Sequence, residues 1–229
     1  MKAFVVGATG YVGRAVVEKL RENGADVVGH VRPDSSRLQM WRQRFEAMGA
    51  EVSSCPFDVD AFATLIETER VDAVFALLGT TRARGDDYMD IDYGLTRRLL
   101  DAVLRQPPAA RPYFVYLSSL GAGQPGRGAY LEARTRVEHD LTASGVDALI
   151  ARPSFISGPG RDEPRPAERV AAVVSDVGLG LFGFFGMSRT RDRLGSIDNH
   201  TLAAGLVRAA AEREPGLRVL HSDGLRPKG

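Results

Sequence analysis

The sequence predicts an α/β protein built on a doubly wound parallel sheet, with a small C-terminal lobe. Two observations indicate this fold. Strand-like and helix-like segments alternate through the first two thirds of the 229 residues, without internal repeats or low-complexity linkers, and a glycine-rich turn joins the first strand to the first helix. A chain of this length with 44% hydrophobic residues can bury a full core in one compact domain. We divide that domain into a core of residues 1–157 and a C-terminal, substrate-side segment of residues 158–229.

The first predicted strand, at residues 2–6, runs directly into the segment GATGYVG at residues 7–13. In a strand, turn and helix of this kind, Gly7 allows the sharp turn, Gly10 lets the backbone approach a pyrophosphate, and Gly13 lets the helix pack closely on the sheet. The helix N-terminus then directs its N–H groups at the phosphates. The spacing is GxxGxxG and not the commoner GxGxxG, but its context predicts a dinucleotide site on a Rossmann fold, in preference to a tight turn without a ligand.

The other strands are predicted where β-branched and aromatic residues cluster between turn signals. They cover residues 26–31, 51–55, 71–78, 113–117 and 147–151, with a short strand at 217–221. Helices are predicted where apolar residues recur every three or four positions. These stripes comprise Val12, Val16 and Leu20, ending at Asn23-Gly24; Leu38, Trp41, Phe45 and Met48; Phe62 and Leu65; and Ile91, Leu95, Leu99 and Ala102, ending before Pro107-Pro108. Further helices are predicted near residues 129–143, 167–174 and 199–211, with a polar, proline-rich loop at 158–166.

Composition narrows the class of protein and its compartment. The 30 basic and 29 acidic residues leave a formal charge of +1, which gives no electrostatic indication of a nucleic-acid partner. The apolar run at the start stops after four residues, and residues 177–187 are too short and too rich in glycine to span a bilayer, so neither export nor a membrane span is predicted. The single Cys55 cannot form an internal disulfide, and we expect a cytoplasmic protein. Either a monomer or a homodimer is compatible with the sequence.

The ligands of an open parallel sheet bind beyond the carboxyl ends of its strands, so the residues that follow each strand are the candidates for the site. Arg32 follows the second strand, where a preference for NAD would place an acidic residue. Its guanidinium suits the 2′-phosphate of NADP, with Arg37 assisting, and the alternative is a solvated surface charge. We therefore expect NADP(H) as the preferred cofactor, with NAD(H) as the other possibility.

Two further strand ends are candidates for cofactor contacts. After the third strand, the Asp58 carboxylate either accepts a hydrogen bond from the adenine amine, beside Val59, or caps the next helix. After the fourth strand, Leu78, Gly79 and Thr80 offer a close backbone approach to the middle of the cofactor, with a simple turn as the alternative.

Candidate catalytic residues follow the fifth strand. Ser118 and Ser119 end that strand, and Tyr130 and Arg134 lie one turn apart at the start of the next helix. Carbonyl reduction requires a serine, a tyrosine and a cation over the nicotinamide: the tyrosine gives up a proton as hydride arrives, the serine polarises the carbonyl oxygen, and the cation binds ribose hydroxyls. Either serine is a candidate, and each residue alone is also compatible with a strand-end turn or a half-exposed helix position.

Taken together, the motifs resemble those of the short-chain dehydrogenases/reductases of the atypical extended type, and more closely the NAD(P)-binding oxidoreductases of the Tat-interactive-protein and NmrA-like branch. The segments that carry the resemblance are GATGYVG at 7–13, Arg32, LGTT at 78–81, YLSSLGAG at 116–123, Tyr130-x-x-x-Arg134 and ARPS at 151–154. The resemblance covers nearly the whole chain, and the order of the motifs is more specific than any one of them.

This resemblance implies a role for each matching residue. The pyrophosphate side would be held by Gly7, Thr9, Gly10, Tyr11, Val12 and Gly13. The resemblance also implies that Arg32 holds the 2′-phosphate, that Asp58 and Val59 flank the adenine, and that Leu78 to Thr80 line the central portion. The segment from Pro153 through Phe155 to Ile156 would lie near the nicotinamide amide, and Tyr130 would be the acid.

Two departures from the family pattern bear on the chemistry. Arg134 stands where the pattern has lysine; arginine keeps the charge but cannot yield a proton near neutral pH, which argues against a proton relay there. The spacing from serine to tyrosine is also short, with Leu120 where some relatives carry the active hydroxyl. The principal hypothesis is an NADP(H)-dependent oxidoreductase of an unknown small carbonyl or alcohol. The alternatives are a catalytically weak NADP(H) sensor, and an epimerase or dehydratase that uses tightly bound NAD.

The sequence gives little support for a metal site or for a site that binds an anionic substrate. His30, His139, His200 and Cys55 lack the spacing of metal ligands, so no metal is predicted. The basic run of Arg189, Arg191 and Arg193 is expected to be a solvated loop face, with contact to an anionic substrate as the alternative. The expected partner is therefore a small-molecule substrate, without nucleic acid or membrane.

Overall fold

A computed structural model of the chain describes residues 1–80, 88–124, 128–158 and 196–227. Its centre is a seven-stranded sheet in the order β3-β2-β1-β4-β5-β6-β9, in which every neighbouring pair is parallel. The strands of this sheet are β1 (Lys2–Val6), β2 (Asp26–His30), β3 (Glu51–Ser53), β4 (Ala73–Ala76), β5 (Tyr113–Leu117), β6 (Ala148–Arg152) and β9 (Leu217–His221). The prediction of a doubly wound parallel sheet is confirmed.

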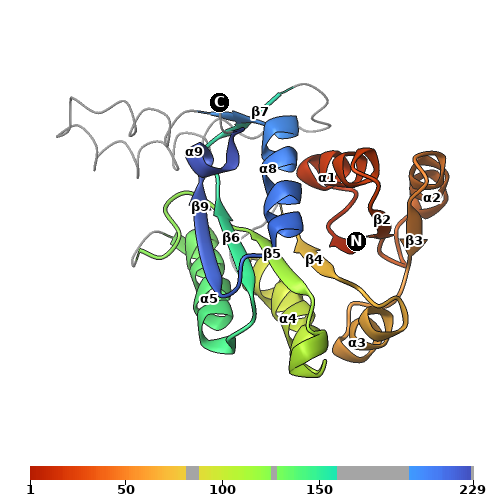
Figure 1. Ribbon diagram of the computed structural model, residues 1–229, viewed down its shortest axis with the longest axis horizontal. Coiled ribbons are helices and arrows are strands. Elements are labelled where there is room, and N and C mark those ends of the chain that lie inside the picture. Colours follow the sequence, from red (N-terminus) through yellow and green to blue (C-terminus); the bar gives the residue numbers. More distant parts are fainter. Residues whose placement is uncertain (81–87, 125–127, 159–195, 228–229) are drawn as a thin grey trace.

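Helices cover both faces of the sheet. Figure 1 shows α1 (Tyr11–Glu22), α2 (Leu38–Ala47) and α8 (Asn199–Glu212) on one face, and α3 (Val59–Thr68), α4 (Thr96–Leu104) and α5 (Gly128–Ser144) on the other. Because the order of the strands reverses between β1 and β4, the helices that follow these two strands lie on opposite faces and leave a crevice at the carboxyl edge. This is the edge at which the sequence predicts the ligand site.

Each face of the sheet has its own hydrophobic core. On the α1 and α2 face, the predicted stripe of α2 is buried through Trp41 and Phe45, whose rings stack at 5.6 Å, while Leu38 and Met48 pack at its border. The opposite core contains the buried rings of Phe4, Phe114 and Tyr116 from the strands, and it is closed by the apolar sides of α3, α4 and α5. Both cores consist of residues that alternate between the faces of the strands, as expected for a buried parallel sheet.

The helix predicted from Ile91 to Ala102 differs in its first half. Residues Tyr88–Leu95 form a π-helix, η1, and the α-helix α4 begins only at Thr96. Within η1 the side chain of Ile91 is exposed and that of Asp92 is fully buried. Ile91, the first residue of the predicted stripe, therefore lies outside the buried face that contains Leu99 and Ala102.

The described C-terminal elements extend the same sheet and its layers. Strand β9 pairs with β6 at the edge of the sheet, and α8 packs against α1. Two short strands that the sequence did not predict, β7 (Ile156–Ser157) and β8 (Ile197–Asp198), pair with each other in parallel, and a short 3₁₀ helix, η2 (Pro108–Ala110), and a last helix, α9 (Ser222–Leu225), complete the elements. The predicted helix near 167–174 and the basic run at 189–193 lie outside the described residues. Within the described residues, no helix has both the length and the apolar character needed to cross a membrane.

Candidate functional site

The turn between β1 and α1 requires glycine at two of its three glycine positions. Gly7 has φ +89°, and a Cβ there would lie 2.7 Å from the backbone carbonyl of Leu77. A Cβ on Gly13 would lie only 2.1 Å from the carbonyl oxygen of Gly7. Gly10 is exposed and precedes α1, which has no side-chain cap and no acidic residue in its first turn. The N-terminus of α1 is therefore suited to an anion, as the motif predicts.

The side chain of Tyr11 contacts the C-terminal part of the chain. Its hydroxyl donates to the carbonyl oxygen of Ser157 at 3.0 Å, and the Nδ2 group of Asn199 donates to its carbonyl oxygen at 3.0 Å. Tyr11 thus links the first turn of α1 to β7 and α8, two elements that the sequence did not associate with the glycine turn. The neighbouring Val12 is buried and Thr9 is half-buried.

Several arginines gather near the carboxyl end of β2. Arg32 is exposed, and its guanidinium forms a long ion pair with Asp34 at 3.8 Å. Arg14 of α1 and Arg37 before α2 both lie against the ring of Trp41, with their guanidinium carbons 5.8 and 6.0 Å from its centroid. The sequence analysis did not select Arg14. A cation in the first turn of a helix faces the positive end of the helix dipole, and this unfavourable position is a signal that could have identified it.

Asp58 was predicted either to contact the adenine or to cap the next helix, and in the structure it caps the helix. The Asp58 carboxylate accepts a hydrogen bond from the Ala61 amide at 2.8 Å and forms the N-cap of α3, whose first residue is Val59. Beside it lies an aromatic cluster in which the buried His30 ring meets Phe57 at 4.5 Å and Phe62 at 5.4 Å. Burial lowers the pKa of His30 and outweighs the hydrogen bond between its Nε2 and the carbonyl oxygen of Cys55.

The segment after β4 contacts side chains from two distant helices. The amide of Thr80 donates to Asp92 Oδ2 at 3.1 Å, and the carbonyl oxygen of Leu78 accepts from Arg134 Nη2 at 3.0 Å. A Cβ on Gly79 would lie 2.8 Å from the same Nη2 atom. The close approach that the sequence predicted at Gly79 is therefore made by a guanidinium of the protein itself.

Arg134, which stands in the lysine position of the motif, is buried. Its Nη2 contacts Asp92 Oδ1 at 2.7 Å in a pair that is almost entirely shielded from solvent, and its Nη1 donates to the carbonyl oxygen of Leu117 at 2.9 Å. Burial opposes the charged form, but the neighbouring Tyr130 and Tyr116 phenols and the Asp92 carboxylate outweigh it and raise the pKa of Arg134. The guanidinium is therefore a permanent cation. Its Nε atom is buried and has no hydrogen-bond partner among the described residues.

The two candidate serines have different surroundings. Ser118 is buried, and its hydroxyl donates to Glu138 Oε1 at 2.6 Å. Arg152 of β6 donates to both oxygens of the same carboxylate. Ser119 is half-buried, and its hydroxyl donates a long hydrogen bond to the carbonyl oxygen of Leu120 at 3.4 Å. Since the Ser118 hydroxyl is already bound, Ser119 is the better candidate for a ligand.

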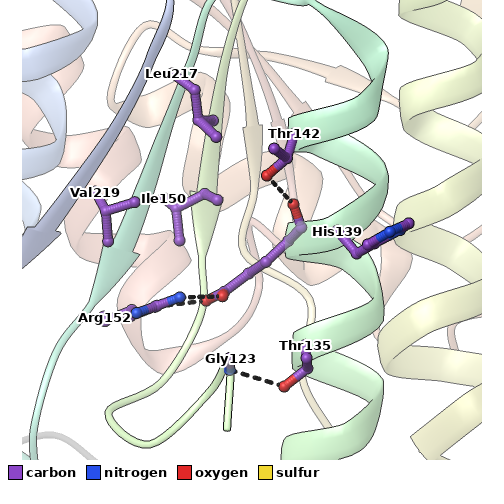
Figure 2. Close-up of a pocket in the computed structure, with 9 residues that line it drawn as sticks. Gly123, Thr135, His139, Thr142, Ile150, Arg152, Leu217 and Val219 are labelled. Atoms are coloured by element: carbon purple, nitrogen blue, oxygen red, sulfur yellow. Dashed lines mark hydrogen bonds and ion pairs between the residues drawn. The ribbon is translucent and has the colours of Figure 1, made fainter.

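The pair formed by Glu138 and Arg152 lines a shallow groove between α5 and the edge of the sheet. Figure 2 shows this groove, of about 200 Å³, with Arg152 below Ile150 and with Leu217 and Val219 of β9 on one side. The groove does not include Tyr130 or Ser119. The groove is therefore separate from Tyr130 and Ser119, and it meets the candidate residues through the bond between Glu138 and Ser118.

Tyr130 lies on the first turn of α5 and is half-buried. Its ring meets that of Tyr88 on η1 edge-on at 5.4 Å, and the guanidinium carbon of Arg134 lies 5.2 Å from its centroid. The structure thus brings Tyr130 and Arg134 together, as the motif predicts. Asp92 is not among the residues predicted from the sequence, because it belongs to no recognised motif.

The segment after β6 reaches the same edge of the sheet. Pro153 is buried, and its carbonyl oxygen accepts from the Leu120 amide at 2.9 Å, which joins it to the end of β5. Phe155 is 38% exposed, whereas Ile156 is buried in β7. No cluster of three His, Cys, Asp or Glu side chains with the geometry of a metal site occurs within the described ranges.

Comparison with known proteins adds a family. A model described as the NAD dependent epimerase/dehydratase family matches residues 3–196. The mitochondrial protein FMP52-1 of Scheffersomyces stipitis is 29% identical over 165 residues, 69% of this chain and 68% of that protein. UDP-glucuronic acid 4-epimerase from Bacillus cereus, solved with NAD, has a TM-score of 0.67 and 18% identity, covering 100% of this chain and 78% of its own. A blue fluorescent protein from a metagenomic library, solved with NADPH, has a TM-score of 0.62 and 19% identity, covering 97% of both chains.

These relatives overturn the expected localisation. FMP52-1 and further fungal relatives, among them those of Aspergillus fumigatus and Debaryomyces hansenii, are all named as mitochondrial, so the expectation of a cytoplasmic protein is wrong. That expectation rested on the single Cys55. A low cysteine count indicates only that disulfides are not used, and it does not distinguish one reducing compartment from another.

Proposed function

The chain belongs to the NAD dependent epimerase/dehydratase family, and from that membership we propose that it binds NADP(H) and catalyses an oxidoreduction of a small carbonyl or alcohol. The observation that carries the proposal is the β1–α1 turn, where a Cβ on Gly13 would overlap the Gly7 carbonyl oxygen and the N-terminus of α1 has no capping side chain. A more specific placement, in the Tat-interactive-protein and NmrA-like branch, is a prediction of the same motifs.

The residues present fit a dinucleotide. The backbone of residues 7–13 would hold the pyrophosphate, residues 78–80 the central portion, and residues 153–156 the nicotinamide end. The orphaned Nε–H of Arg134 is a buried donor that a ribose hydroxyl would satisfy. We assign residues 1–157 to the cofactor-binding core and residues 158–229 to the substrate side; Asn199 of the second segment reaches the glycine turn by donating a hydrogen bond to the Tyr11 carbonyl oxygen.

The preference for NADP(H) rests on the charges near β2. Arg32 would bind the 2′-phosphate directly, with Arg37 and Arg14 beside it at the Trp41 ring. Titration of the purified protein with NADPH and NADH tests this: we expect NADPH to bind at least tenfold more tightly, and Arg32→Ala to remove most of that difference. Equal affinities, or tighter binding of NADH, would favour the epimerase or dehydratase alternative, which needs firmly held NAD.

In the proposed reaction the cofactor, when bound, supplies or accepts the hydride. Tyr130 transfers the proton at its hydroxyl, and Ser119 donates a hydrogen bond to the substrate oxygen. Arg134 provides a fixed positive charge 5.2 Å from the Tyr130 ring centroid, without exchanging a proton itself. Phe155, exposed beside the same edge, offers an apolar contact for the substrate.

The decisive experiment measures NADPH oxidation with a panel of small aldehydes, ketones and sugar nucleotides. We expect turnover with at least one of them and a loss of about 10²-fold or more in Tyr130→Phe. Tyr93→Phe is the matched control, because the Tyr93 hydroxyl is bonded to Asp140 at 3.0 Å and not to the site. Undiminished turnover in Tyr130→Phe would refute the assignment of the acid.

A second function, a sensor that binds NADP(H) without turnover, is favoured by one observation. The cation of the tyrosine motif is paired with Asp92, so its charge is largely neutralised within the protein. A sensor would bind NADPH with micromolar affinity, on the order of −8 kcal/mol, and would oxidise it with no member of the panel. Hydride transfer detected by stopped-flow absorbance would exclude this alternative.

A further inference from the structure

Gly79 and Arg134 are 55 positions apart in the chain, yet they limit each other's space. A Cβ on residue 79 would lie 2.8 Å from Arg134 Nη2, closer than real Cβ contacts allow. The end of an arginine can usually move aside, but this one is held by the Leu78 carbonyl oxygen at 3.0 Å and by Asp92 at 2.7 Å. The glycine of the LGTT segment is therefore explained by the guanidinium, without any ligand.

Asp92 holds the other side of the same segment. While Oδ1 contacts Arg134, Oδ2 accepts from the amide of Thr80 at 3.1 Å. Asp92 is fully buried on the π-helix η1, and Thr96 holds that turn by donating to the Asp92 carbonyl oxygen at 2.7 Å. One ion pair thus binds both ends of the three residues 78–80.

Arg134 also connects this segment to the strand that carries the serines. Its Nη1 donates to the carbonyl oxygen of Leu117, the residue before Ser118, and Tyr130 lies one turn earlier on the same helix. We propose that Asp92 and Arg134 are a positioning pair that fixes residues 78–80 relative to Tyr130 and the end of β5, with Gly79 required by the guanidinium and not by the cofactor. This inference rests on the proposed cofactor site only for its effect on binding.

A double-mutant cycle separates the two explanations of Gly79. In the wild-type background, Gly79→Ala must displace the guanidinium from a charged hydrogen bond, and we expect NADPH to bind about tenfold more weakly. In an Arg134→Met background the obstructing Nη2 atom is gone, so Gly79→Ala should change the affinity by less than about twofold. An equal loss in both backgrounds would show that the glycine serves the cofactor and would overturn the proposal.

Removing the charge of Arg134 leaves Asp92 buried without its partner, which is destabilising. Arg134→Lys therefore provides the second background: the shorter lysine keeps the ion pair but lacks the forked group that obstructs residue 79. If the guanidinium is what requires a glycine at position 79, Gly79→Ala should again change the NADPH affinity by less than about twofold in this background. Arg136→Met is the control, since Arg136 pairs with Glu132 on the exposed side of α5.

Hydrogen exchange of the cofactor-free protein tests the same pair without any ligand. We expect the Thr80 amide to exchange at least tenfold faster in Asp92→Asn and Arg134→Met, which break the ion pair, than in wild type, and Arg136→Met to leave it unchanged. Unchanged exchange of Thr80 in both variants would overturn the positioning role. If wild type binds neither NADPH nor NADH, the proposed function fails, while this exchange measurement still decides the inference.

Discussion

The turn between β1 and α1 and the junction of β5 with α5 both lie at the carboxyl edge of the sheet, but different groups hold them in place. At the turn, the positions are set by backbone atoms of neighbouring residues, as the 2.1 Å approach of a Gly13 Cβ to the Gly7 oxygen indicates. At the junction, they are set by the buried side chains of Arg134 and Glu138, which bind groups from other elements. A turn fixed by its own backbone can be recognised from consecutive residues in the sequence. A site held by side chains that are distant in the sequence cannot.

The largest expected effect comes from adding a side chain in the turn between β1 and α1. In Gly13→Ala the added methyl group would overlap the carbonyl oxygen of Gly7. The substitution should therefore lower the free energy of unfolding by about 3 kcal/mol, measured by urea denaturation. Gly10→Ala is the matched comparison, because its Cβ would meet only the Gly7 oxygen, at 3.2 Å. It should cost about 1 kcal/mol through a poorer helix cap, while clearly weakening NADPH binding. Similar stability losses in both variants would contradict the distinction between packing and ligand approach.

The sequence predicted the sheet, its helices and the glycine turn because these depend on local periodicity and on backbone conformation. It did not predict Asp92 as part of the site, because the role of this carboxylate depends on Thr80 and Arg134, which lie on other elements. Nor did it choose between Ser118 and Ser119, because the choice depends on Glu138, which lies 20 residues beyond Ser118 on another element. Asp58 remained ambiguous because a helix cap and an adenine contact use the same carboxylate.

A second prediction distinguishes the roles of Ser118 and Ser119 at the junction of β5 with α5. Ser118→Ala removes a donor from the buried Glu138 and should cost about 1–3 kcal/mol of unfolding free energy, with turnover retained. Ser119→Ala should leave stability unchanged and lower turnover by about 10²-fold, if the protein has the proposed activity. Both quantities are measured on the same preparations. A loss of turnover in Ser118→Ala at unchanged stability would reverse the assignment.

A smaller effect concerns a buried titratable ring at the end of β2. Because burial lowers the pKa of His30 in the folded protein, the unfolded chain binds more protons once the pH falls below the ordinary histidine value of about 6.5. Stability should therefore be complete above that pH and decline as the pH falls toward the folded pKa. His30→Phe should flatten this decline between pH 7 and 5, whereas His139→Phe, whose ring is 82% exposed, should leave it. An identical decline in wild type and His30→Phe would assign it to another group.

The smallest expected effect decides what Asp58 does. Asp58→Ala removes the cap of α3 and should cost about 1 kcal/mol. Asp58→Ser keeps a capping oxygen but is too short to reach an adenine amine, so it separates the two roles that one carboxylate combines. If the cap is the whole function, Asp58→Ser should match wild type in both unfolding free energy and NADPH affinity. A weaker NADPH complex at wild-type stability would instead assign Asp58 to the cofactor, and would add one side chain to a region otherwise organised by its backbone.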